Sequence, residues 1–161
     1  MQSPHESLSK IEQIEQAIMQ ISWLSQRQFM QLLDEERFRL TVPQFYTLLH
    51  LHQAEGPCKM TELAELTHQS AASLTGVVDR LLEKELVERT RHERDRRQVM
   101  VVVTAKGSHL LREIKQARNE QMQAALASLG SEHMDLLQEM LNHVLEGMVL
   151  VLERGDRQRW A

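Results

Sequence analysis

Apolar residues recur every three or four positions over long parts of this chain, the spacing that places them on one face of a helix. Residues 7–33 carry the first such stripe, and the regions after residues 104 and 131 carry two more. We expect one long helix in each of these three regions, with Thr104 as the cap of the second and Ser131 as the cap of the third. The first stripe consists of Leu8, Ile11, Ile14, Ile18, Ile21 and Leu24.

Shorter helical patterns lie between the first and second stripes. Thr41 stands three residues before Gln44, with Pro43 between them, and this combination is typical of a capped helix start. That helix should end near the Gly-Pro pair at residues 56–57 because both residues disfavour its continuation.

The next segment changes from helical to strand periodicity. A short helix should start at Thr61, and Ser70 should cap another that runs to about Glu85. Val101–Val103 is a β-branched run that favours a strand, and residues 86–90 are a second plausible strand. Two short helices followed by a hairpin form a winged helix-turn-helix, in which one helix enters the major groove of DNA. The predicted fold class is therefore mainly α with a small β-wing.

The turn of this hairpin, or wing, is rich in arginine. Residues 80–118 hold eleven Lys or Arg against six Asp or Glu, although the whole chain has a net charge of −4. Positive potential therefore concentrates where it would attract the phosphates of duplex DNA. The alternative is a solvated loop that only keeps the protein soluble. The candidate phosphate contacts are Arg89, Arg91, Arg94 and Arg96.

An acidic residue, Asp95, stands among these arginines. An unpaired carboxylate would repel phosphate, so we expect Asp95 to pair with a neighbouring arginine and to hold the wing tip in shape. This pairing frees another arginine to enter the minor groove. Arg97 is the first candidate for that insertion and Arg94 the second.

The helix that Ser70 caps has two different faces. One face is apolar, with Leu74, Val78, Leu81 and Leu82, and should pack on the core. The opposite face has small and hydrogen-bonding residues towards its N-terminal end, which suits entry into the major groove. An ordinary solvated face, the alternative, would hold more Lys and Glu. The candidate base-reading residues are Gln69, Ser70, Ala72, Ser73, Gly76 and Arg80.

Residues 95–104, DRRQVMVVVT, resemble the D-x-R-x-x-x-V-x-L-T wing pattern of MarR-type bacterial regulators, with Val103 in place of the usual leucine. Residues 79–84 and 104–107 resemble the segments that follow the recognition helix and the wing in that family. The resemblance runs over the whole chain. It implies a triangular homodimer with a winged helix-turn-helix in each lobe, which usually represses transcription until a small ligand or an oxidant releases it.

By the same resemblance, Asp95 and Arg97 take the wing roles given above. Two positions depart from the family pattern. Gly76 stands where many relatives carry a polar or basic residue, and a glycine there costs the helix about 1 kcal/mol. Glu85 stands where the family usually has glycine, so a positive φ at that turn would strain it mildly.

The apolar stripes at the two chain ends are larger than the small central domain can cover. We expect a second copy of the chain to cover them, with residues 1–40 and 105–161 forming a dimerisation region and residues 41–104 the DNA-binding domain. The alternative is an intramolecular helical bundle in a monomer. A dimer would act as a regulator, in the family's usual way a repressor, that recognises a pseudo-palindromic site in double-stranded DNA.

A small-molecule effector would bind between the dimer helices and the reading domain. Trp23, Arg27, Phe45 and His50 could line such a cleft with mixed apolar and polar character. Each of them could equally be an ordinary core or surface residue. The sequence does not indicate the chemistry of the effector.

Two other kinds of site have weaker support. Cys58 has Lys59 as its only basic neighbour and no second cysteine, so a half-buried structural role is favoured over redox sensing. His50 and His52 are two residues apart and point to different helix faces, and the other histidines are scattered. We therefore expect no metal site and no cofactor.

Several function classes are disfavoured. Paired carboxylates, a glycine-rich phosphate loop and a cysteine–histidine pair at useful spacing are all absent, so an enzyme is not expected. The longest apolar runs are too short to cross a membrane, and the first residues lack a secretory signal pattern, which favours a cytoplasmic protein. The remaining alternative is a winged-helix protein-interaction module without DNA binding, which an acidic or uncharged hairpin would have favoured.

Overall fold

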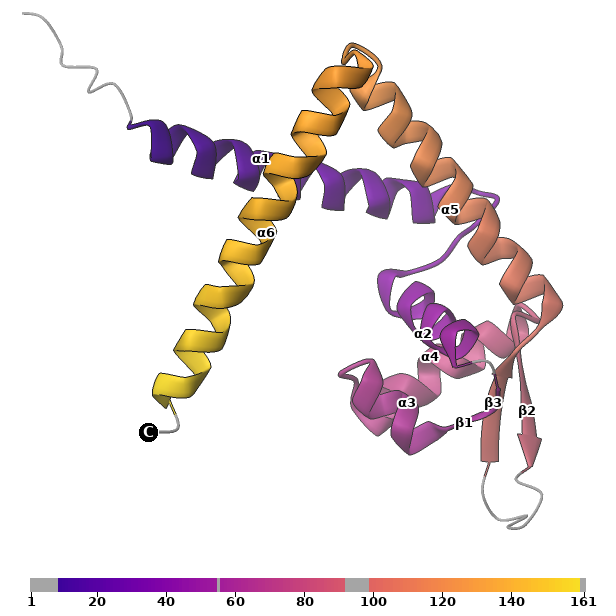
Figure 1. The fold of residues 1–161 in the computed structure, drawn as a ribbon. Coiled ribbons are helices and arrows are strands. Elements are labelled where there is room, and N and C mark those ends of the chain that lie inside the picture. Colours follow the sequence, from indigo (N-terminus) through magenta and orange to yellow (C-terminus); the bar gives the residue numbers. More distant parts are fainter. Residues whose placement is uncertain (1–8, 55, 92–98, 160–161) are drawn as a thin grey trace, which may run out of the picture. The chain divides into compact units, whose positions relative to one another are not determined.

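A computed structural model describes residues 9–54, 56–91 and 99–159 of the 161-residue chain. The chain forms two compact units, Met1–Asn119 and Glu120–Ala161. It is mainly helical with one small antiparallel sheet, as the sequence predicts (Figure 1). The elements are α1 (Lys10–Asp34), α2 (Val42–Gln53), β1 (Cys58–Lys59), α3 (Met60–Leu66), α4 (Ala71–Glu83), β2 (Val87–Arg91), β3 (Val99–Val103), α5 (Ala105–Leu126) and α6 (Ser131–Arg159).

Both helices before the helix-turn-helix start with a capping box. The Thr41 hydroxyl accepts a hydrogen bond from the Gln44 backbone N–H at 3.4 Å, and the Gln44 side chain accepts one from the Thr41 N–H at 3.0 Å. Ser9 and Glu12 form the same box at α1. The box satisfies N–H groups that have no acceptor within the helix. The predicted cap at Thr41 is confirmed, whereas α1 begins at Lys10 rather than at residue 7.

α3 and α4 form the helix-turn-helix. Ser70 caps α4 as predicted, since its hydroxyl accepts a hydrogen bond from the Ser73 N–H at 3.2 Å. α3 begins at Met60 without a side-chain cap, one residue before the predicted start at Thr61.

Neither α3 nor α4 ends at a glycine. At the end of α4, the N–H of Glu85 bonds to the Leu82 carbonyl and the N–H of Leu86 to the Leu81 carbonyl. This Schellman motif requires a left-handed residue, and φ is 61° at Glu85. α3 ends in the same motif at His68, where φ is 52°. The turn into the wing therefore does need the positive φ that disfavours Glu85.

The strands form a three-stranded antiparallel sheet in the order β1-β3-β2. The two strands expected from the sequence pair with each other, from Val87 opposite Val103 to Arg91 opposite Val99. β1 is a third strand that pairs with β3, and in it Cys58 lies opposite Val101. Two residues are too few to show a strand periodicity, so the sequence does not predict β1.

A single core holds α2, α3, α4 and the sheet together with the C-terminal end of α1 and the first half of α5. The predicted inner face of α4 is confirmed for Leu74, Val78 and Leu81, while Leu82 is only partly buried. From the helices on either side, the core takes Phe29, Leu32, Leu33, Leu111, Ile114 and Ala117.

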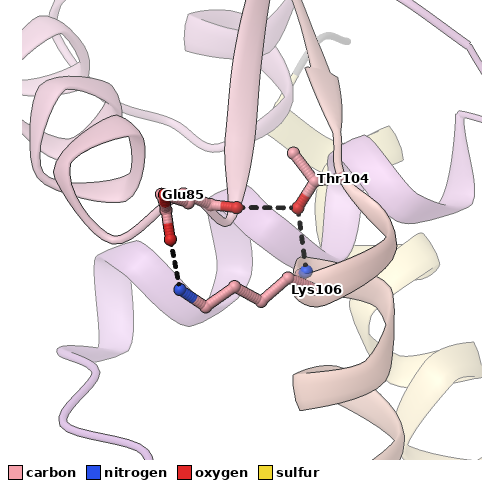
Figure 2. Close-up of polar contacts among 4 residues, drawn as sticks. Glu85, Thr104 and Lys106 are labelled. Atoms are coloured by element: carbon pink, nitrogen blue, oxygen red, sulfur yellow. Dashed lines mark hydrogen bonds and ion pairs between the residues drawn. The ribbon is translucent and has the colours of Figure 1, made fainter.

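α5 begins at the base of the sheet, where Thr104 caps it as predicted. The Thr104 hydroxyl accepts from the Gly107 N–H at 3.1 Å and donates to the Glu85 carbonyl at 2.8 Å, and Lys106 Nζ lies 2.8 Å from the Glu85 carboxylate (Figure 2). This contact with Lys106 lowers the pKa of Glu85. A Cβ at residue 107 would lie 2.2 Å from the Leu86 carbonyl oxygen, so this close approach requires glycine.

α6 differs from every other long helix because none of its side chains described over 131–153 is buried. Ser131 is its first helical residue rather than the predicted cap, and the Met134 N–H bonds to the Gly130 carbonyl. The N-terminal part of α1 is similarly open, with Ile11 78% exposed. Within the parts of the chain that the structure describes, no helix has the length and apolar character that a membrane span needs. The exposed large apolar side chains of α6 are Met134, Leu136, Met140, Leu141, Val144, Leu145, Met148, Val149, Leu150, Val151 and Leu152.

Candidate nucleic-acid interface

One face of α4 is open and almost uncharged. Its apolar face packs in the core, so the residues on the opposite side are left to solvent. A Cβ at Gly76 would meet no atom within 4 Å, which leaves the helix backbone accessible there. Small residues let a groove approach the helix closely. The exposed candidates on α4 and at its cap are Ser70, Ala72, Ser73, Gly76 and Arg80.

Gln69, the sixth candidate, is placed differently. Its side chain is partly buried, and its Nε2 donates a hydrogen bond to the hydroxyl of Thr47 at 3.0 Å. Its Oε1 accepts one from the Ser73 hydroxyl at 3.4 Å. Thr47 is completely buried in α2. Each end of the Gln69 amide therefore makes a hydrogen bond within the protein.

An ion pair joins α4 to the wing. Arg89 on β2 lies 2.5 Å from the carboxylate of Asp79 on α4, and both side chains are about half exposed. Sequence reasoning missed this partner because the two residues belong to different elements and no periodicity connects them. The pair restrains the wing relative to α4, and Arg89 keeps enough exposure for its predicted phosphate contact, which stays a prediction.

The other predicted wing residues lie at or beyond the end of β2. Arg91 is its last residue and is exposed. Arg94, Asp95, Arg96 and Arg97 lie outside the described residues, so the roles expected for them stay predictions.

A cavity of about 330 Å³ lies between α1, α2 and α5. The Arg118 guanidinium stands 4.8 Å from the centre of the Phe29 ring, and the Phe29 and Phe45 rings meet edge to face at 4.9 Å. The lining residues are Phe29, Phe45, Leu49, His52, Gln53, Leu111, Arg112, Ile114, Lys115 and Arg118.

Among the four residues predicted to contact an effector, Phe45 lines this cavity. Arg27 and Trp23 instead face each other, with the guanidinium 5.3 Å from the ring centre. His50 lies on α2, partly buried, and is not part of the lining. Sequence reasoning missed the basic residues of α5 because nothing in their spacing relates them to α2.

The surroundings of Cys58 do not activate its thiol, and the described residues contain no metal-binding cluster. Cys58 is buried, and its thiol donates a weak hydrogen bond to the Gly56 carbonyl at 3.8 Å. Burial, with a smaller effect from Glu62, raises the pKa of the thiol and so disfavours the reactive thiolate. Over residues 9–54, 56–91 and 99–159, no three His, Cys, Asp or Glu side chains lie close enough to hold a metal ion.

Comparison with known proteins gives consistent matches. The MarR family model matches residues 40–99, from just before α2 to the first residue of β3. An uncharacterised HTH-type transcriptional regulator of Bacillus subtilis, YpoP, is 33% identical over 90 residues, which are 56% of this chain and 61% of YpoP. The HTH-type transcriptional repressor NicR of Pseudomonas putida is 40% identical over 73 residues, which are 45% of this chain and 46% of NicR. The matched part thus spans less than two thirds of either relative.

The fold is shared with solved structures. A mutant of Staphylococcus aureus MepR bound to an oligodeoxyribonucleotide superposes with a TM-score of 0.71 and 19% identity, covering 84% of this chain and 97% of that protein. At that identity the likeness concerns the fold alone.

Proposed function

The MarR family model matches residues 40–99 of this chain, and from that premise we propose that the chain is a MarR-type transcriptional repressor that binds a pseudo-palindromic site in double-stranded DNA as a homodimer. It would act in the cytosol, where bacterial DNA lies. One observation carries the proposal: the exposed, nearly uncharged face of α4 beside a basic wing.

The face of α4 suits the major groove better than open solvent. Ser73 presents a hydroxyl near the N-terminal end, and Gly76 lets a base edge approach the backbone. Arg80 follows further along the same face, where it can meet a phosphate. The wing supplies the sequence-independent attraction through Arg91 and the arginines that follow it.

The open apolar face of α6 supports the dimer. Its large apolar side chains are exposed in the described residues, and several apolar side chains on the N-terminal part of α1 are exposed as well. Two copies that bury these surfaces against each other would hold two α4 helices at a fixed separation. We expect half-sites about one helical turn, on the order of 10 base pairs, apart.

Salt dependence tests DNA binding directly. Counterion release from roughly six to ten phosphate contacts predicts that affinity for a duplex falls by about a thousandfold or more between 50 and 200 mM salt. Fluorescence anisotropy with labelled duplexes measures this fall, and a variant in which Arg91, Arg94 and Arg96 are alanine should show a shallower one. A flat salt response would contradict DNA binding and leave the winged-helix interaction module as the better function.

The cavity between α1, α2 and α5 is the place we assign to an effector that releases the DNA. Aromatic rings at Phe29 and Phe45 and the cations of Arg112, Lys115 and Arg118 favour a flat, anionic compound. Screening aromatic carboxylates by thermal shift and then by release of bound DNA tests this. Lys115→Ala should weaken both effects, and Lys10→Ala, at the far end of α1, should change neither.

A further inference from the structure

Three side chains joined by hydrogen bonds lead from the core to the open face of α4. Thr47 is buried on α2, Gln69 lies in the turn before α4, and Ser73 is exposed in the first turn of α4. The Gln69 amide connects the two hydroxyls, with its nitrogen 3.0 Å from Thr47 and its oxygen 3.4 Å from Ser73. This is the only polar contact that the structure gives the Thr47 hydroxyl within the described residues.

The direction of these hydrogen bonds limits what Ser73 can do. The amide nitrogen can only donate, so it faces the lone pairs of Thr47. The amide oxygen can only accept, so the single proton of the Ser73 hydroxyl is used inside the protein. The lone pairs of Ser73 remain available on the exposed side.

We propose that Gln69 is a positioning residue that fixes Ser73 as a hydrogen-bond acceptor, so that Ser73 selects bases with a donor in the major groove. This proposal rests on the proposed DNA-binding function. Adenine N6 and cytosine N4 are such donors, whereas guanine O6 and thymine O4 are acceptors. Thr47, which no base touches, holds the Gln69 amide in this arrangement and so contributes to the specificity at one position of each half-site. Gln69 itself reads no base, which revises the role expected from the sequence.

The test is selection of duplexes from a randomised pool by the full-length protein, followed by sequencing. The position read by Ser73 is the one whose base distribution changes in Ser73→Ala. At that position the unmodified protein should favour A or C over G or T by roughly three- to tenfold, the worth of one hydrogen bond. Thermal melting of every variant establishes that it is folded.

Four variants test the roles of Gln69 and Thr47 separately. Gln69→Ala and Thr47→Val should each reduce the preference to less than about twofold, because the hydroxyl of Ser73 is then free to donate. Gln69→Glu should keep the preference at lower overall affinity, since a carboxylate still accepts from Ser73 but repels phosphate. Thr47→Ser should keep it as well because it retains the hydroxyl. Thr47→Ala, used in place of Thr47→Val, decides the role of Thr47 should the valine variant fail to fold.

The matched control is Thr67→Val, because the Thr67 hydroxyl donates to the Leu63 carbonyl of its own helix at 2.7 Å. It should leave the selected sequences unchanged. A preference for G or T, a folded Thr47→Val that keeps the full preference, or a Gln69→Ala that alters a position untouched by Ser73→Ala would each overturn the proposal. Salt-dependent binding without any enriched sequence would also overturn it while leaving DNA binding intact, whereas loss of both would remove the proposed function too.

Discussion

The core of the first unit and α6 contain the same kinds of side chain in opposite environments. Leu48 and Leu63 are completely buried, whereas Leu145 and Leu152 are 59% and 69% exposed. Both regions show the same helical spacing of apolar residues. Periodicity therefore tells which face of a helix is apolar, but it does not tell whether that face is covered by the same chain or by another.

The energetic consequence differs between the two regions. Full burial of a Leu or Val side chain contributes about 1.5–3 kcal/mol, so the core leucines stabilise the monomer fold directly. The α6 side chains contribute only when a second surface covers them. The first region should thus determine whether the chain folds, and the second whether it assembles.

Removal of residues 131–161 should have the largest effect on assembly. The truncated chain would lose the whole apolar face of α6, and we expect it to be monomeric or aggregated and to bind a half-site without the avidity of a linked pair. Sedimentation of the intact and truncated chains, combined with footprinting on a selected duplex, measures both changes. A truncated chain that stays dimeric and protects the full site would show that the dimer forms elsewhere.

The same substitution in the two regions should have separable effects. Leu48→Ala should lower the free energy of unfolding by about 2–5 kcal/mol, because it leaves a cavity in a closed core. Leu145→Ala should instead weaken the dimer and leave the unfolding of the dissociated chain nearly unchanged. Denaturant titrations at several protein concentrations distinguish the two, since only an effect on the dimer depends on concentration. If both variants lost the same free energy of unfolding at every protein concentration, the proposed difference between the core and α6 would be contradicted.

Replacing a glycine by alanine should also change stability differently in the two regions, by a smaller amount. Gly107→Ala places a methyl group against the Leu86 carbonyl and should cost about 1–3 kcal/mol. A methyl group added at residue 147 meets no atom of its own chain within 4 Å, so Gly147→Ala should stabilise α6 by up to about 1 kcal/mol. Thermal melts of both variants give the comparison. A destabilised Gly147→Ala dimer would show instead that the partner chain packs closely against this residue.

Glu85→Gly should have the smallest effect on stability because it has two opposing consequences. Glycine relieves the positive φ, but the contact with Lys106 is lost. The ion pair is exposed and therefore screened by salt. The glycine variant should gain in melting temperature relative to the unmodified protein as salt is raised, and Lys106→Ala, which lacks the same ion pair, should show a similar gain. A salt-independent difference would mean that the ion pair contributes nothing.

The elements with strong local signals were predictable, and the site was predictable only in part. Thr41, Ser70 and Thr104 cap helices as expected because a cap depends on residues three positions apart. The turn of Gln69 towards Thr47 was not predictable, since the two residues are 22 positions apart and both are polar. The Asp79–Arg89 pair was missed for the same reason. Predicting a contact between two elements requires the packed structure, whereas predicting a helix cap or an apolar face does not.

The position of α6 after the core also has a consequence for synthesis in the cell. The core of the first unit is complete at Ala117, and α6 follows it along the chain. A ribosome needs roughly 2–9 s to add the residues from 118 to 161, and a small mixed domain folds far faster than that. The first unit can therefore be folded before the apolar helix leaves the ribosome. If a second copy covers α6 as proposed, nascent chains would expose it only in the interval before they meet that partner, which would limit the time available for aggregation.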